Sequence, residues 1–410
     1  MDDLRATLGH FDADAPLPAA PDPWDYLPMP TVRRGPPWAT AEAIAAESGL
    51  VARIGRRLLA DGSAPALAAA IREAAAAGWR VVVTGCGTSE HAAMGVAAIL
   101  GEAWRTAGLR GPGPVSEQAL ELALDPRAGG LVIGISHEGG TGATIAALDA
   151  ARAAGARTWA ITASAGSPVT RGPDGVLETV ELDLSWCHTV GYVSPLAAAT
   201  VTAGLLAGHA PEPDRLRARL AAGIDAAFGP HAGIGATLAG RHHLLVIASG
   251  ADRVTARELA LKVEEAAWIP TTARDLETFL HGHIPATDAD TGLVLVLLER
   301  GSLDLRAARA RQALAAAAEV GVTCAAILGA DAAALVPARL TPAGRIVVPE
   351  APRMPNAPAA LLGGAAPLQL VTVGLAAARG TNPDPIRRDD RRYLRAAEVA
   401  DLPQPAGREA

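Results

Sequence analysis

Residues 80–89 read RVVVTGCGTS, an apolar run that ends in the glycine cluster Gly85-Cys86-Gly87. The run predicts a buried strand over 80–84, and a helical pattern follows it over 91–100. In doubly wound α/β proteins, ligands bind at glycine-rich turns of this kind, because the free N–H groups of the turn lie at the carboxyl end of the sheet. This stretch therefore predicts an α/β fold with a ligand site at its first turn.

The same strand–turn–helix unit recurs along the chain. A second apolar run, over 131–135, opens into the turn SHEGGT (136–141) and a helical pattern over 143–154. Further strands are predicted at 158–162, 176–182, 243–248, 293–298, 323–328 and 345–348. Strands that alternate with helices of this length are typical of βαβ units. The expected fold class is α/β, with parallel sheets flanked by helices.

The alternation stops and restarts near residue 215, which divides the chain into two similar halves. We expect an irregular, proline-rich leader at 1–40 that lies over the body of the protein. A first domain follows at 41–210, a second at 220–380 and a tail at 381–410. Helical patterns at 42–77 and near 194–207 flank the strands of the first half.

The amino-acid composition and net charge argue against several classes of protein. Half of the 410 residues are apolar, the formal net charge is −7, and there is no basic run, which argues against nucleic-acid binding. The three cysteines are far apart, so a disulfide scaffold and a CxxC metal clip are excluded, and we expect a reducing, cytoplasmic environment. Two uncharged stretches, 190–211 and 354–378, contain prolines and are predicted to be buried helices rather than membrane spans.

The two turns carry hydroxyl groups beside their glycines. Thr88 and Ser89 follow the first cluster, and Ser136 and Thr141 bracket the second. Such hydroxyls, together with backbone N–H groups, can hold an oxyanion. Neither turn matches the GxGxxG or GxxxxGK[ST] nucleotide motifs. A single glycine turn after a strand is most often structural, but two in one half favour a ligand site.

Four ordered motifs resemble those of the sugar isomerase (SIS) domain family, in the tandem arrangement of the isomerase half of glucosamine-6-phosphate synthase. The family's C-G-T-S matches Cys86-Gly87-Thr88-Ser89, and its S-x-S-G-x-T corresponds to residues 136–141. A-L-K-x-x-E matches residues 260–265, and a later His-Gly matches His281-Gly282. The resemblance covers about residues 41–395.

The resemblance implies an aldose–ketose isomerisation without a cofactor or metal. The glutamate of A-L-K-x-x-E, here Glu265, would move a proton between C1 and C2 of the open-chain sugar. His281 would assist ring opening from the neighbouring subunit of a homodimer. The turns would bind the sugar or sugar phosphate through two groups of residues. These are Cys86, Gly87, Thr88 and Ser89 in the first turn, and Ser136, His137, Glu138, Gly139 and Thr141 in the second.

Lys262 is the only lysine in the chain, against 35 arginines, and it lies on the same helical face as Glu265. We expect it to pair with that carboxylate or with the substrate. The alternative is an ordinary surface ion pair. An arginine would serve such a pair equally well, so the single lysine favours a role in the site.

Glu138 departs from the family, because a serine that binds phosphate normally occupies its position. A carboxylate about 4 Å from a phosphate charge costs roughly 4 kcal/mol at an effective dielectric constant near 20. The helix N-terminus returns only about 0.3–1 kcal/mol. Glu138 must therefore turn away or be offset by a cation, or the ligand carries no phosphate there.

Three further departures limit the chemistry. With only about 40 residues before the first half, no glutaminase half is expected, and therefore no glutamine hydrolysis. Arg391 stands where the synthases carry a tail lysine that forms an imine with the sugar, and a guanidinium group cannot act as that nucleophile. Any role of the tail, through Arg387, Arg388 or Arg391, would be electrostatic. The corresponding turn of the second half, Glu299-Arg300-Gly301-Ser302, lacks the phosphate motif, which predicts one ligand site per chain.

Several polar residues receive weaker predictions. Glu277 precedes His281 by one helical turn and is expected to orient it. Thr189 is expected to cap the helix that follows it, and Ser116 to be structural. A metal site at His281, His283 and nearby Asp288 lacks strand context, and none is predicted.

The sequence thus favours an isomerase or deaminase of sugar phosphates or amino-sugar phosphates. Two alternatives stay open. One is a non-catalytic regulator that binds a carbohydrate derivative, which the changes at Glu138 and Arg391 would suit. The other is a deglycase that cleaves amine-linked sugar phosphates with the same base and histidine.

Overall fold

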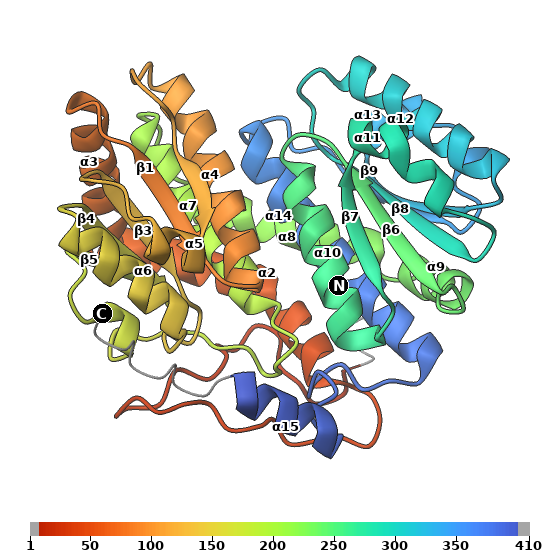
Figure 1. The fold of residues 1–410 in the computed structure, drawn as a ribbon, viewed down its shortest axis with the longest axis horizontal. Helices are drawn as coiled ribbons and strands as arrows, with labels where there is room; N and C mark the ends of the chain where they lie inside the picture. Colours follow the sequence, from red (N-terminus) through yellow and green to blue (C-terminus); the bar gives the residue numbers. More distant parts are fainter. Residues whose placement is uncertain (1–7, 401–410) are drawn as a thin grey trace, which may run out of the picture.

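The computed structural model describes residues 8–400, in which ten strands form two five-stranded sheets, all of them parallel. The first sheet has the order β2-β1-β3-β4-β5 and the second has the order β10-β9-β8-β6-β7. Read from the other edge, the second sheet repeats the order of the first. The predicted α/β class with two similar halves is confirmed, and the halves lie side by side (Figure 1).

The first half comprises five strands and the helices around them. Its strands are β1 (Val81–Gly85), β2 (Val115–Gln118), β3 (Leu131–Ile135), β4 (Arg157–Thr162) and β5 (Gly175–Glu178). Its helices are α2 (Ala39–Ala60), α3 (Ser63–Ala76), α4 (Thr88–Thr106), α5 (Ala119–Leu124), α6 (Gly142–Ala153) and α7 (Val190–Leu206). The crossover helices α4 and α6 follow β1 and β3, which are neighbours in the sheet. The carboxyl ends of these two strands therefore form the switch point where ligands bind in such sheets.

The second half repeats this plan. Its strands are β6 (His243–Ala248), β7 (Thr271–Asp275), β8 (Thr291–Leu297), β9 (Thr323–Gly329) and β10 (Arg345–Val348). Its helices are α8 (Pro213–Ala227), α9 (Pro230–Leu238), α10 (Asp252–Ala267), α11 (Leu276–Thr278), α12 (Leu303–Glu319), α13 (Ala330–Leu335) and α14 (Asn356–Arg379). A last helix, α15 (Arg391–Ala400), belongs to the tail.

Eight of the ten strands fall where the apolar runs predicted them, within a few residues at each end. The predicted strand at 176–182 ends early, since β5 stops at Glu178. The edge strands β2 and β7 were not predicted, because neither carries an apolar run and most of their residues are only half-buried. The helical pattern at 42–77 is two helices, separated at Asp61 and the left-handed Gly62.

Two apolar helices, α7 and α14, run through the centre of the molecule. Helix α14 packs against α8, α9 and α10, and α7 packs against α2, α3 and α4. By length and composition α14 could cross a membrane, but 94% of its most apolar window is buried inside the protein. Both uncharged stretches therefore form core helices, as expected.

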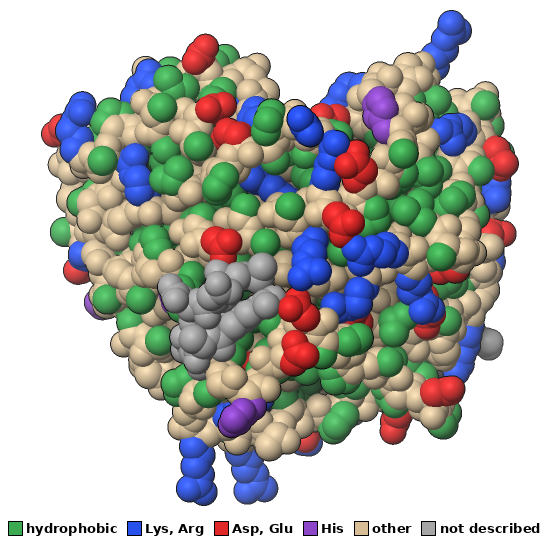
Figure 2. Space-filling view, turned by 180° about the vertical axis from the view of Figure 1, so that it is seen from behind, with side chains coloured by type: hydrophobic (Ala, Val, Ile, Leu, Met, Phe, Trp, Pro, Cys, Tyr) green, Lys and Arg blue, Asp and Glu red, His purple; other side chains and the backbone are tan. Residues whose placement is uncertain are grey.

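The leader and the tail lie at one end of the molecule (Figure 1). From residue 8 onward the leader is irregular, as predicted, and it buries Leu8, Ala13 and Leu17 in the core. It also pairs Ala19 with Glu181 in an isolated antiparallel bridge. Helix α11 lies at the opposite end, where a notch separates the two halves on the surface (Figure 2). Residues 1–7 and 401–410 of the predicted leader and tail are outside the described range.

Candidate active site

The first glycine turn joins the two halves of the chain. Gly87 has a positive φ of 56° and precedes α4, and the Cβ of any other residue at Gly85 would stand 2.6 Å from the carbonyl oxygen of Ser89. The turn therefore requires its glycines. The hydroxyl of Thr88 donates to Glu258 on α10, in the second half, at 3.3 Å. His91, one turn further along α4, is 2.7 Å from the same carboxylate.

Helix α10 presents a row of charged side chains at this interface. The ammonium group of Lys262 lies 3.5 Å from Glu258 and 2.6 Å from Glu265. The side chains of Lys262 and Glu258 are each 1% exposed, while that of Glu265 is 20% exposed. The pair of Lys262 and Glu265 is therefore not the solvated surface pair of the alternative interpretation.

Burial and charge oppose each other at Lys262. Desolvation lowers its pKa, but the charges of Glu265 and Glu258 outweigh that effect and raise the pKa above its ordinary value. Desolvation likewise raises the pKa of Glu258, but the charge of Lys262 and the hydrogen bond with His91 lower it overall. Lys262 is thus a permanent cation between two carboxylates, and only Glu265 is partly open to solvent.

A cavity of about 450 Å³ lies beside Glu265. Its lining comes from the end of α10, the segment after it and the tail: Glu264, Glu265, Trp268, Ile269, Pro270, Ile386, Arg387 and Tyr393. The guanidinium group of Arg387 lies over the ring of Trp268 at 4.4 Å and over that of Tyr393 at 4.1 Å. The tail therefore supplies a cation to the cavity that contains Glu265.

The second glycine turn (136–141) lies at the carboxyl end of β3. Gly139 has a φ of 84°, and a Cβ there would stand 2.0 Å from the hydroxyl oxygen of Ser167, so only glycine fits. The hydroxyl of Ser136 donates to that of Thr141 at 3.1 Å. The leader packs against this turn, since the indole N–H of Trp24 donates to the carbonyl of Glu138 at 2.9 Å.

Glu138 pairs with a histidine. Its carboxylate is 3.2 Å from the ring of His188, which follows β5 in the chain. Desolvation lowers the pKa of His188, but the hydrogen bond with Glu138 and the charge of Asp183 raise it overall. Desolvation raises the pKa of Glu138, but the same bond and the charge of His188 lower it overall. Of the three outcomes expected for Glu138, the structure comes nearest to the second, because it pairs Glu138 with a basic side chain whose pKa is raised.

Residues 75–203 match the family model of the SIS domain. Over 341 residues the chain is 30% identical to the glutamine–fructose-6-phosphate aminotransferase [isomerizing] of Pyrobaculum aerophilum. The first half of this chain therefore contains a SIS domain. The alignment covers 79% of this chain and 53% of the relative, so the chain spans about half of that relative's length.

Solved structures share the fold of both halves. The C-terminal domain of the glucosamine-fructose-6-phosphate aminotransferase from Francisella tularensis superimposes with a TM-score of 0.72. It covers 86% of this chain and 99% of that chain at 18% identity. The tagatose-6-phosphate ketose/aldose isomerase from Escherichia coli gives a TM-score of 0.68 at 17% identity, and covers 87% and 97% of the two chains. At these identities the likeness concerns the fold.

In the SIS half, Asp183 organises the surroundings of the second turn. Its carboxylate accepts from the backbone N–H groups of Thr189, Val190 and Gly191 at 2.8 Å each, and lies 3.2 Å from His137. Burial raises the pKa of Asp183, but the His137 bond and neighbouring charges lower it strongly overall. Thr189 occupies the predicted N-cap position, but its own side chain makes no capping bond, and Asp183 caps α7 instead.

The other sequence-predicted residues of the SIS half lie on the two turns or beside them. The thiol of Cys86 is within 4.0 Å of Gln118 and 3.9 Å of Thr144, and burial raises its pKa. Ser116 lies on the edge strand β2. Ser89 follows Thr88 in the first turn of α4, and Gly139 shapes the second turn.

His281 is not brought to Glu265 within one chain. It follows β7 and α11 at the end of the molecule opposite to α15, and its side chain is 70% exposed (Figure 1). As predicted, Glu277 contacts it, at 2.8 Å. Hydrogen bonds from Arg309 and His281 lower the pKa of Glu277 to about 2.

The tail residue singled out by alignment is not the one at the cavity. Arg391 is exposed at the start of α15, whereas Arg387 lines the cavity. In the second half, the polar groups of the turn after β8 form hydrogen bonds with other residues of the chain. Arg300 donates to the carbonyls of Ala351 and Met354, and Glu299 accepts from Asn356.

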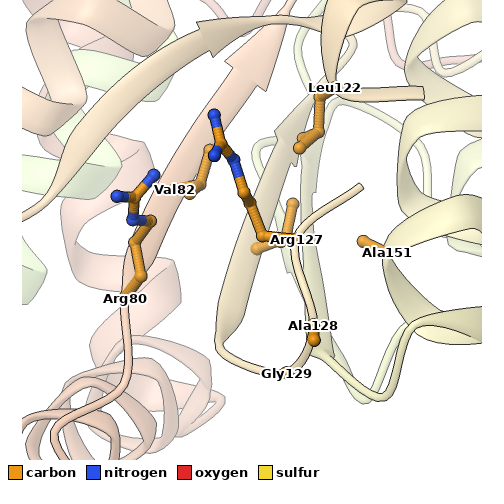
Figure 3. Close-up of a pocket in the computed structure, with 8 residues that line it drawn as sticks. Arg80, Val82, Leu122, Arg127, Ala128, Gly129 and Ala151 are labelled. Carbon is orange, nitrogen blue, oxygen red and sulfur yellow. The ribbon is translucent and has the colours of Figure 1, made fainter. Parts of the chain in front are cut away.

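A second cavity, of about 250 Å³, lies away from this site (Figure 3). It is formed at the amino ends of β1 and β3 by Arg80, Val82, Leu122, Arg127, Ala128, Gly129, Val132 and Ala151. Its floor is apolar and its lining contains no carboxylate, so it offers no general base. The arrangement around α10 and the two turns is therefore the candidate active site.

Sequence reasoning missed four contributors to this site: Glu258, His91, Asp183 and Trp24. Glu258 stands four residues before Lys262, a spacing that in a helix places both side chains on one face. The role of Glu258 could therefore have been predicted from the sequence. The other three come from distant segments, and no local spacing connects them to the motifs.

Proposed function

We propose that this chain is a SIS-type isomerase or deaminase that moves a proton between C1 and C2 of an open-chain sugar or sugar phosphate. The observation that carries the proposal is the pair of Lys262 and Glu265. A buried cation holds a carboxylate at 2.6 Å on the wall of a cavity, and contacts through Glu258 link that pair to the first glycine turn.

In this mechanism Glu265 is the catalytic base. It takes the proton from one carbon of the open-chain sugar to give an enediolate, a hydroxyl proton passes from one oxygen of the enediolate to the other, and Glu265 returns its proton to the adjacent carbon. Lys262 fixes the position of the carboxylate, and because its pKa is raised it remains an ammonium ion and does not take part as a base. The turns hold the rest of the sugar through Ser89, Thr141 and the backbone N–H groups of the two helix N-termini.

Ring opening would use His281 of a second copy of the chain. In its own subunit this histidine is exposed at the far end of the molecule, held by Glu277, so a homodimer would have to bring it to the site of its partner. An imine from the tail is not part of the mechanism, because Arg391 lacks a nucleophilic amine.

The proposed setting is the cytoplasm, which the three free thiols suit, with a small sugar as the ligand and no nucleic acid or membrane. No metal or cofactor is required, since a single carboxylate can carry out the proton transfer.

The test is exchange of solvent deuterium into a panel of hexoses, hexosamines and their phosphates, followed by mass spectrometry. The wild-type chain should exchange one carbon-bound hydrogen of its substrate, and Glu265→Gln should lose this activity while melting at the same temperature. The matched control is Glu319→Gln, which removes an exposed carboxylate at the end of α12. Binding without exchange in the wild type would show a regulator, and undiminished exchange in Glu265→Gln would reject the assignment of the base.

A further inference from the structure

Arg387 lines the cavity beside Glu265, and its guanidinium group contacts aromatic rings rather than a carboxylate. It lies over the ring of Trp268 at 4.4 Å and over that of Tyr393 at 4.1 Å. In the part of the chain that the structure describes, residues 8–400, its side chain forms no ion pair and no hydrogen bond. Aromatic contacts stabilise the charge of a guanidinium group but do not satisfy its five N–H donors. Arg387 is half-buried, so a ligand in the cavity can reach these donors.

The segment that carries Arg387 is fixed to the body of the protein. The buried carboxylate of Asp384 accepts from two backbone N–H groups at the start of α2, at 3.0 and 2.9 Å. The hydroxyl of Thr381 donates at 2.7 Å to the carbonyl of Ala266, near the end of α10. These bonds hold the tail against the helix that carries Glu265, so the fold itself places Arg387 at the cavity.

Three residues that line this cavity have a left-handed backbone conformation. Trp268, Ile386 and Arg387 have φ values of 57°, 43° and 64°. Only two other residues within the described range 8–400, apart from glycines, have a positive φ. Such a conformation is costly for a bulky side chain, and most of all for a β-branched residue such as Ile386. Residues held in this way are concentrated at active sites and ligand clamps. The backbone therefore points to a binding role for this segment independently of its charge.

Both carboxylates of the lining are already bound by other groups. Glu265 pairs with Lys262 at 2.6 Å, and Glu264 accepts from the backbone N–H of Thr271 at 3.0 Å. Glu264 is also exposed, so water weakens its repulsion of an anion. Among the described residues that line the cavity, Arg387 is the only cation, and it has no carboxylate of its own.

One further carboxylate of the tail, that of Asp390, lies within the electrostatic reach of Arg387. Hydrogen bonds from Arg392 lower the pKa of Asp390, and the charge of Arg387 makes a smaller contribution in the same direction. The carboxylate is 2.7 Å from the guanidinium group of Arg392. Arg392 rather than Arg387 therefore binds Asp390, and the N–H groups of Arg387 stay available to a ligand.

A guanidinium group with free donors binds a phosphate or a carboxylate through two parallel hydrogen bonds. The proposed function places C1 and C2 of the open-chain sugar at Glu265, so Arg387 is left for a substituent further along the chain. The second glycine turn carries Glu138 in place of the serine that binds phosphate in the motif it resembles. An anionic sugar in this cavity would thus depend on the tail for its cation.

We propose that Arg387 binds the terminal anionic group of the sugar, a phosphate or a carboxylate, and selects anionic over neutral sugars. The inference rests on the proposed function, since it takes the cavity beside Glu265 to be the sugar site. It assigns the substrate class of that site and makes Arg387 a specificity residue without any part in the proton transfer.

Calorimetric binding of three sugars tests the inference without any turnover. The probes are glucose, glucose 6-phosphate and glucuronate, which differ in the group at C6. The wild-type chain should bind at least one of the two anions about tenfold or more tightly than glucose, and the anion that it prefers identifies the group that Arg387 takes. If glucose binds as tightly as both anions, or if neither anion binds at millimolar concentration, the proposal is wrong.

Arg387→Gln removes the guanidinium charge and should reduce the preference to less than about twofold while leaving the affinity for glucose unchanged. A purely structural role of Arg387 would instead weaken the binding of glucose and of the anions together. Arg387→Lys keeps the charge without the paired donors, so it should retain part of the preference. A preference that persists in Arg387→Gln, with the variant folded by its melting curve, would also overturn the proposal.

The matched control is Arg388→Gln, which removes the next guanidinium group of the same segment. Arg388 lies over the ring of Trp186 at 4.6 Å and does not line the cavity. This variant should keep the preference for the anion. An equal loss in both variants would show a general effect of tail charge rather than a subsite at Arg387.

Deuterium exchange separates this proposal from the proposed function. If the wild type exchanges no hydrogen of any sugar, but Arg387→Gln abolishes the preference for the anion, the subsite is supported and the isomerase is rejected. If the wild type exchanges and Arg387→Gln keeps the preference, the isomerase is supported and the subsite is rejected.

Discussion

Lys262 lies 2.6 Å from Glu265 across one turn of α10, with its ammonium group buried and a second carboxylate, Glu258, 3.5 Å away on its other side. Two carboxylates and one cation at a buried interface between the halves have consequences for stability as well as for chemistry. Burying an unpaired charge is costly, so each member of the group depends on the others.

Replacing Lys262 with methionine should destabilise the protein by about 3–5 kcal/mol, because Glu258 would be left buried without its cation. The free energy of unfolding from urea titrations measures this loss. The double variant Lys262→Met with Glu258→Gln should lose less stability than the sum of the losses in the two single variants. In the double variant neither Lys262 nor Glu258 leaves a buried charge without its partner. Additive losses would contradict the coupling.

The pair of Glu138 and His188 should give the stability a defined pH dependence. The folded-state pKa of His188 is raised above 6.5, so its contribution is complete below pH 6.5 and is lost as the pH rises through the folded-state value. The folded-state pKa of Glu138 is lowered below 4.5, so its contribution is complete above pH 4.5 and is lost on further acidification. The pair therefore contributes most between these two values.

Denaturation midpoints from pH 4 to pH 9 measure this contribution as the difference between the wild type and Glu138→Gln. The difference should be largest near pH 5–6 and should shrink toward alkaline pH. A difference that is constant over the whole range would show that the pair does not titrate with folding. The variant Asp149→Asn, in an exposed pair with Arg152, is the control for loss of a surface carboxylate.

The sequence was sufficient for the fold because both signals of an α/β protein are local. Apolar runs such as 131–135 mark buried strands, and the glycines at 85, 87 and 139 mark turns that no other residue can adopt. The edge strands β2 and β7 were not predicted because an edge strand needs no continuous apolar run. Their pairing with β1 and β6 is made by the backbone, which leaves no trace in side-chain type.

The site was predictable only where its residues share one element. Lys262 and Glu265 stand three residues apart on one helix, so their pairing could be expected from spacing. The contact of Glu138 with His188 joins segments fifty residues apart, and it depends on how the loop after β5 folds back over the second turn. Spacing carries no information of that kind, and the sequence left three outcomes open for Glu138.

Trp24 should matter more for ligand binding than for folding. Trp24→Phe keeps an aromatic ring but removes the indole N–H that donates to the carbonyl of Glu138. A hydrogen bond of this kind is worth about 0.5–1.5 kcal/mol, so sugar affinity should fall about two- to tenfold while the melting temperature changes little. Calorimetry with the preferred sugar measures the change. An unchanged affinity would show that the leader does not hold the turn in its binding conformation.

Variants of His281 test whether a homodimer completes the site. The test needs a substrate that gives measurable activity, whichever sugar that is. If His281 completes the site of the partner subunit, the single variants Glu265→Gln and His281→Ala are each inactive as homodimers. A dimer of one subunit of each kind contains one site with both wild-type residues, supplied by different chains, and one site with neither. Subunits unfolded and refolded together in equal amounts form such dimers about half of the time, and each has one working site of two, so about one quarter of the wild-type activity should return.

The exposed position of His281, held by Glu277 at the end of the molecule away from α15, leads us to expect this recovery. If both residues act within one chain, every site in the mixture lacks one of them, and no activity returns on mixing.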